Sequence, residues 1–124
     1  MQITTSPTQA LKEALTDVLQ CQENTRDRHW WSIQEYEADA DCAFLPNQVC
    51  IHLAFVDDGS SSSNDLKYFA IAPSEAIKVI RSASIDGDAS HFDRFWAVYE
   101  ALMFTIYGED WPDYANEDGH GLTL

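Results

Sequence analysis

The chain has 124 residues, 45% of them apolar and 12% aromatic, which is enough for one buried core without disulfide or metal crosslinks. It carries 21 Asp and Glu against 7 Lys and Arg, a formal net charge of −14. This charge disfavours direct binding to DNA, RNA or anionic membranes and attracts basic surfaces. The first residues lack the features of a signal peptide, and no apolar run is long enough to span a membrane. We therefore expect one cytoplasmic domain over residues 1–124.

The first helix is predicted to begin at Ser6. Ser6 and Gln9 fit a capping box, and Pro7 suits the first helical position. Five apolar residues then recur at helical spacing and form one stripe: Leu11, Ala14, Leu15, Val18 and Leu19. The polar segment 22–28 ends this helix.

Strands are predicted in the middle of the chain, where apolar and polar residues alternate. The first strand covers 29–36, with Trp31 and Ile33 on one face, and the second covers 48–56. Between them, Cys42 to Leu45 is a candidate for a further short strand before the turn at Pro46-Asn47.

A Ser-rich loop at 57–65 follows the second strand. Its composition is typical of a flexible connection. We expect it to join a hairpin in which residues 66–71 return as the third strand.

Two helices are predicted in the C-terminal half. Pro73-Ser74 begins a short helix, and Ser90 caps a longer one that Gly108 ends. The longer helix has an apolar and aromatic stripe: Phe92, Phe95, Trp96, Tyr99, Leu102, Met103 and Ile106. The order of elements predicts an α+β fold, in which a small antiparallel sheet of three or four strands has one N-terminal and two C-terminal helices on one face.

Metal and thiol chemistry has weak support in the sequence. Cys50 and His52 share one face of a strand, and Cys42 is the nearest further ligand, but zinc needs three or four convergent ligands. With Cys21 the cysteines number three at irregular spacing, which predicts no disulfide framework. We expect no metal and no cofactor.

The segment Asp86 to Ser90 is similar to the start of an EF-hand loop. His91 and Ala97 stand where that loop needs a Gly and an acidic residue, so we interpret the segment as a turn before the Ser90 cap. No nucleophile elbow, phosphate-binding loop or dinucleotide fingerprint occurs, and an enzyme is not the expected function.

The acidic residues are the main functional signal. Carboxylates in rows can take the place of phosphates in a channel lined with Lys and Arg, although a solvated acidic surface would have the same composition. The candidate carboxylate contacts are Glu35, Glu37, Asp39, Asp41, Asp57, Asp58, Glu109, Asp110 and Asp113. Aromatic side chains often anchor such contacts, and the candidate anchors are Trp30, Tyr36, Trp111 and Tyr114.

Three short stretches carry a family resemblance. Trp30, Trp31 and Ile33 form a Trp-rich strand after the first helix. The stretches Cys42-Ala43-Phe44-Leu45-Pro46 and Ala72-Pro73-Ser74-Glu75-Ala76 follow it. The chain thereby resembles the ArdB/KlcA antirestriction proteins, small plasmid and phage products, which have Gly-Phe-Tyr-Met-Ala-Pro and Ser-Ala-Asp-Ala-Ala at these two places. The Gly-Gly before the Phe of that family is absent here, and no functional residue is carried over.

The resemblance implies an anti-defence role, of the antirestriction or anti-CRISPR kind. Together with the charge it favours an inhibitor or regulator that binds a basic surface of a nucleic-acid-handling protein. Two alternatives remain open on sequence alone. One is an immunity or adaptor protein for a single toxin or enzyme, and the other is a small thiol or metal-dependent enzyme centred on Cys50 and His52.

Overall fold

The computed structural model describes residues 6–25, 28–56, 65–117 and 119–121. The elements in chain order are α1 (Pro7–Leu19), β1 (Trp30–Glu35), β2 (Val49–Phe55), β3 (Asp65–Ile71), α2 (Pro73–Ser82), α3 (His91–Tyr107), the 3-10 helix η1 (Gly108–Tyr114) and β4 (Gly119–Gly121). The predicted α+β fold, with one N-terminal and two C-terminal helices, is confirmed. Within the described ranges, no helix combines the length and apolar character that crossing a bilayer requires.

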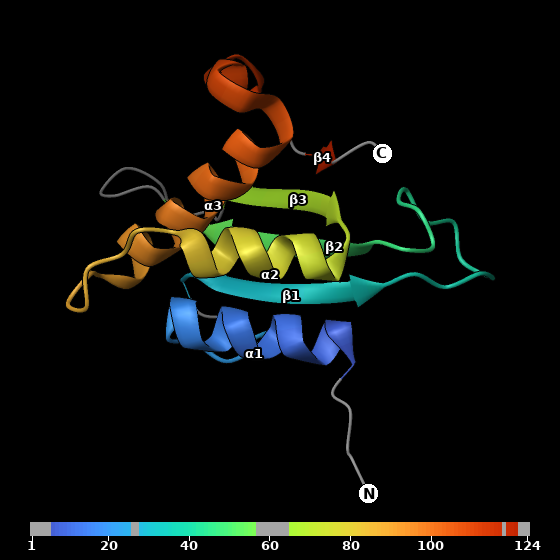
Figure 1. Cartoon of the computed structure of the whole chain (residues 1–124), viewed down its shortest axis with the longest axis horizontal. Helices are drawn as coiled ribbons and strands as arrows, with labels where there is room; N and C mark the ends of the chain where they lie inside the picture. The colour runs from blue at the N-terminus through green and yellow to red at the C-terminus, as the bar shows by residue number, and fades with distance from the viewer. Residues whose placement is uncertain (1–5, 26–27, 57–64, 118, 122–124) are drawn as a thin grey trace, which may run out of the picture.

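The four strands lie in the order β1-β2-β3-β4 (Figure 1). Neighbours among β1, β2 and β3 are antiparallel, and their register places Ile33 beside Ile51 and Ile51 beside Phe69. The predicted hairpin between the second and third strands is thereby confirmed. β4 pairs with β3 in parallel, so the sheet is mixed rather than wholly antiparallel.

The candidate strand at Cys42–Leu45 is wrong, because this segment is an irregular part of the loop between β1 and β2. Both edges of β2 are occupied by β1 and β3. The outer edge of β1 is also partly satisfied, since Ile33 N donates to the Glu23 carboxylate and Asn24 N donates to Trp31 O. The predicted turn is present, with Gln48 N donating to Leu45 O at 2.9 Å.

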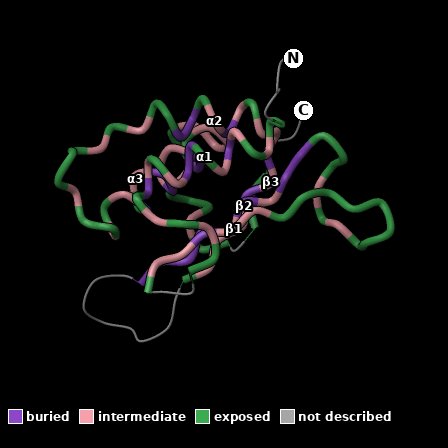
Figure 2. Tube along the Cα trace, turned by 90° about the horizontal axis from the view of Figure 1, so that it is seen from below, coloured by how far each residue is buried: buried purple, intermediate pink, exposed green. Residues whose placement is uncertain are grey.

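All three α-helices cover the same face of the sheet, and the opposite face carries no helix (Figures 1 and 2). The strands contribute fully buried side chains at Trp31, Ile51, Leu53, Phe69 and Ile71. The helices contribute Leu11, Leu15, Leu19, Ile80, Phe95, Val98 and Leu102. The core is therefore one-sided, and the alternation of each strand decides which residues enter it.

The predicted helix ends agree with the structure. The hydroxyl of Ser6 accepts a hydrogen bond from Gln9 N, and that of Ser90 accepts one from Asp93 N, both at 3.1 Å. α3 stops at Gly108, whose φ of 71° favours glycine. In α3, Val98 joins the core, whereas Trp96 of the predicted stripe lies at its edge and is 38% exposed.

Arg94 connects α3 to two other parts of the chain. Its guanidinium donates to Val18 O near the end of α1, and to Asp86 O and Gly87 O in the loop after α2. Its Nε donates to Ala89 O at 3.3 Å. One half-buried cation thus satisfies four backbone carbonyls and fixes the loop 83–90 against the helices.

Replacing Arg94 with Ala should lower the free energy of unfolding by about 2 kcal/mol, because four hydrogen bonds from a charged donor are lost, and those to Val18 O and Ala89 O are partly buried. Arg81→Ala is the control, since Arg81 makes an exposed ion pair with Asp17 and its loss should cost at most about 1 kcal/mol. Urea denaturation measures both. Equal losses for the two variants would show that Arg94 does not hold the loop.

Candidate protein-binding site

Four of the predicted contact carboxylates lie together at one end of the sheet. Glu35 ends β1, and Glu37, Asp39 and Asp41 follow in the loop that extends beyond the ends of β1 and β2; all four are exposed (Figure 1). No Lys or Arg occurs between His29 and Leu66. None of the ion pairs found among the described residues involves these four carboxylates. We call residues 35–48 the acidic loop.

The acidic loop also presents apolar side chains. Leu45 is 49% exposed and Tyr36 is 36% exposed, and the ring of Tyr36 meets the edge of Phe44 at 6.2 Å. Sequence reasoning missed Phe44 and Leu45 as contact residues because it placed them in a strand. Two large apolar residues soon after an acidic run were the signal that could have found them.

A hollow of about 470 Å³ separates the acidic loop from the edge of the sheet. Phe44 and Leu45 line it on the loop side, and Ala70 of β3 and Gly121 of β4 line it on the sheet side. A smaller hollow of about 280 Å³ shares Phe44, Ala70 and Gly121 and continues toward Tyr68. Most of this lining is apolar and none of it is a carboxylate, so the hollow is suited to an apolar side chain.

Trp30 lies elsewhere on the uncovered face. It is half-buried and pairs with Ala54 across β1 and β2. Asp57 and Asp58 lie outside the described residues.

The other predicted contacts lie at the C-terminal end of α3. Glu109, Asp110 and Asp113 are exposed on η1. Tyr114 is 40% exposed and stacks on Tyr107, with ring centroids 4.2 Å apart. Figure 1 shows η1 and the acidic loop at separate places, so the structure does not join the two acidic segments into one patch.

Trp111 contacts the core rather than projecting from η1. It is half-buried, packs against the core and meets Tyr99 edge-on at 6.1 Å. Only part of its indole is therefore available to a partner.

Hydrogen bonds tie the segment after η1 to the sheet. Lys67 of β3 donates to Ala115 O and Glu117 O, both at 2.9 Å. The hydroxyl of Tyr107 lies 2.8 Å from Nδ1 of His120 in β4. The ammonium group of Lys67 therefore binds backbone carbonyls of this chain.

Cys50 and His52 lie on the uncovered face of β2, but their environments do not favour thiol chemistry. Burial raises the pKa of the Cys50 thiol to about 11, with a smaller contribution from the nearby Cys42. Burial lowers the pKa of His52, whose ring meets Tyr68 edge-on at 4.8 Å. Its Nε2 is buried and has no hydrogen-bond partner among the described residues.

In the part of the chain that the structure describes, no group of three or more His, Cys, Asp or Glu could hold a metal ion. The segment similar to an EF-hand is a turn, in which Ala89 N donates to Asp86 O at 3.1 Å before the Ser90 cap. This agrees with its interpretation from sequence.

Comparisons with protein-family models, with curated proteins and with solved structures found no match to this chain. The resemblance to the ArdB/KlcA proteins therefore stays a prediction.

Cys50 should react slowly with iodoacetamide in the folded protein, because a thiol with a pKa of about 11 is roughly one part in ten thousand thiolate at pH 7. In a Cys21→Ser, Cys42→Ser variant, alkylation followed by mass spectrometry should be at least about tenfold faster in urea than in buffer. Raising the pH toward 11 should accelerate the reaction of the folded protein. Equal rates in urea and buffer at pH 7 would contradict this environment for Cys50.

Proposed function

We propose that this protein is an acidic inhibitor or regulator that binds a basic surface of another protein through its acidic loop. The observation that carries the proposal is the set of exposed carboxylates in a loop whose Phe44 and Leu45 also line an apolar hollow; none of these carboxylates forms an ion pair with a described residue. The partner is a nucleic-acid-handling protein, and the carboxylates occupy the positions that phosphates take in its binding channel.

The distribution of basic residues supports this reading of the acidic loop. Lys12 pairs with Glu23 at 3.3 Å, and Lys78 pairs with Glu75 at 3.5 Å. Arg94 and Lys67 donate to backbone carbonyls. Each of these cations serves the helical layer or the C-terminal segment. None of these four cations therefore pairs with a carboxylate of the acidic loop.

The two components of the site should have different kinetic roles. Exposed carboxylates accelerate encounter with a basic surface, and salt weakens this effect because the screening length is about 8 Å at physiological ionic strength. Charge-assisted hydrogen bonds to Lys and Arg then form at the loop. An apolar side chain seated in the hollow would slow dissociation, since buried anchors determine most of the residence time.

An anti-defence role is the specific form of the proposal. Proteins that cut foreign DNA bind it through basic channels, and a small acidic domain can occupy such a channel without binding DNA itself. The resemblance of the sequence to antirestriction proteins supports the same class of target.

The proposal is tested by capturing the partner from host cells at low salt and then measuring its association rate. Reversing Asp39 and Asp41 to Lys should slow association by about tenfold or more, and the stability of the protein should change by only about 0.5 kcal/mol. The same variant should also displace DNA from the partner less effectively than the unmodified protein does.

The matched control is a Glu13→Lys, Glu75→Lys variant. It has the same net charge as the Asp39→Lys, Asp41→Lys variant, but its changes lie on α1 and α2. It should associate within about threefold of the unmodified protein at physiological salt, where distant charges are screened. Equal slowing by the two variants, or an affinity that does not change with salt, would mean that the charge only keeps the protein soluble.

A further inference from the structure

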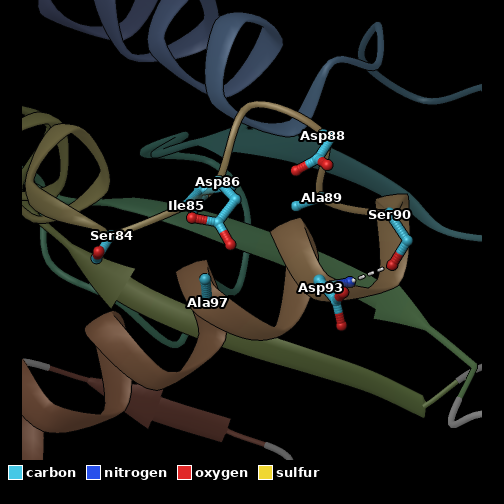
Figure 3. Close-up of a pocket in the computed structure, with 8 residues that line it drawn as sticks. All are labelled: Ser84, Ile85, Asp86, Asp88, Ala89, Ser90, Asp93 and Ala97. Atoms are coloured by element: carbon cyan, nitrogen blue, oxygen red, sulfur yellow. Dashed lines mark hydrogen bonds between the residues drawn. The ribbon is translucent and has the colours of Figure 1, made fainter.

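A groove with several acidic residues runs along α3, beside the loop that joins α2 to α3. Its wider part is a hollow of about 510 Å³ between this loop and the first turns of α3 (Figure 3). A neighbouring hollow of about 390 Å³ continues along α3 toward Trp111. The two hollows share Ser84 and Ala97, so they form one continuous groove. We call it the α3 groove.

The two ends of the α3 groove differ in chemistry. Asp86 and Asp88 on the loop and Asp93 on the first turn of α3 border the wider end (Figure 3). At the other end, Phe104 is 54% exposed although it lies within an apolar helix, and it lines the groove together with Trp111 and one carboxylate, Glu100. The charged residues that line the groove are all acidic.

Small residues form the part of the groove between these ends. Ala97 and Ala101 lie one helical turn apart on α3, and both are half-buried. A side chain no larger than a methyl group lets another backbone approach α3 closely. From Asp93 to Phe104 the helix rises about 16 Å, which matches about three turns of a partner helix.

The groove is held in shape before any partner arrives. The guanidinium of Arg94 donates to the carbonyls of Asp86 and Gly87, and its Nε donates to Ala89 O. The Ser90 hydroxyl fixes the start of α3 through its hydrogen bond with Asp93 N. Binding would therefore require little ordering of the loop, which lowers the entropic cost of association.

We propose that the α3 groove docks an amphipathic helix of a partner protein, with Lys or Arg at one end and apolar side chains along the remainder. The basic end lies against Asp86, Asp88 and Asp93, and the apolar side chains lie over Ala97 and Ala101 and against Phe104. This mode of helix-in-groove recognition uses apolar anchors at helical spacing. The proposal extends the proposed function, because it gives the same basic partner a second contact.

The acidic lining selects this occupant over a second copy of the same chain. A copy also carries a net charge of −14, so its approach to a groove bordered by Asp86, Asp88 and Asp93 is opposed by repulsion. A basic helix instead gains charge-assisted hydrogen bonds at the same place.

The probe is a synthetic helical peptide of about 14 residues, with Lys and Arg in its first turn and Leu at helical spacing after it. Titration followed by amide chemical shifts should perturb the backbone around Ala97, Ala101 and the loop 84–90. Phe104→Ala should weaken binding by about tenfold, and because Phe104 is exposed the variant should remain folded. Asp86→Asn with Asp88→Asn should weaken binding severalfold and reduce its salt dependence.

Two controls separate this proposal from the proposed function. A peptide with the same charges but Ser in place of Leu should bind at least about tenfold more weakly. The Asp39→Lys, Asp41→Lys variant should bind the probe within about twofold of the unmodified protein, because the changed residues lie outside the groove. Binding of the partner from cells by this variant tests the acidic loop, and binding of the probe tests the groove. The two proposals can therefore fail independently.

Three outcomes would overturn the groove proposal. They are shifts confined to the acidic loop, no effect of Phe104→Ala, and a concentration-dependent dimer that Phe104→Ala abolishes. The last would assign the groove to a second copy, and sedimentation of the protein without the probe would detect it.

Discussion

The structure depends on one packing constraint, which is that three helices bury their apolar sides on a single face of a narrow sheet. Trp31 on β1 and Leu53 on β2 are cross-strand partners, and both side chains are fully buried beneath the helices. The alternation of the strands sends Cys50 and His52 to the other face, which carries no helix. The surfaces that remain for recognition are therefore the uncovered face, the loops at the ends of the sheet and the outer side of α3.

The same constraint explains where the few basic residues lie. Arg94 fixes the loop after α2 to the helices, and Lys67 fixes the segment after η1 to the sheet. Lys12 pairs with Glu23, whose other carboxylate oxygen accepts from Ile33 N at the outer edge of β1. Because these cations connect elements of the fold, none of the ion pairs among the described residues involves a carboxylate of the acidic loop or of the α3 groove. This division of charge between structure and surface is the physical basis of the proposed binding role.

The sequence was sufficient to predict elements whose signals are local. Ser6 and Ser90 cap their helices through their own hydroxyl groups, and the alternation in β2 needs no distant residue. It could not predict β4, because Gly119–Gly121 has no strand pattern and pairs only after α3 has returned the chain to β3. Cys42–Leu45 looked like a strand, but it pairs with none of the strands of the described sheet.

The candidate sites, like the fold, could be predicted from the sequence only where their signals are local. The exposed carboxylates of residues 35–41 could be predicted from composition, whereas the hollow beside them requires Ala70 and Gly121, which are distant in sequence. The α3 groove lies between α3 and the loop 83–90, which Arg94 connects to the helix through hydrogen bonds to Asp86 O and Gly87 O. Long-range packing, which no local pattern encodes, therefore decides where carboxylates and apolar surface coincide.

The most direct test of the central claim is carboxyl footprinting of the protein with and without its captured partner. Carbodiimide labelling, resolved by mass spectrometry, reports the accessibility of each carboxylate. The account predicts that Glu37, Asp39 and Asp41 become protected severalfold in the complex, whereas Glu13 on α1 is labelled at the same rate in both states. Unchanged labelling of the three loop carboxylates in a complex that is otherwise intact would contradict the claim that the acidic loop is the binding surface.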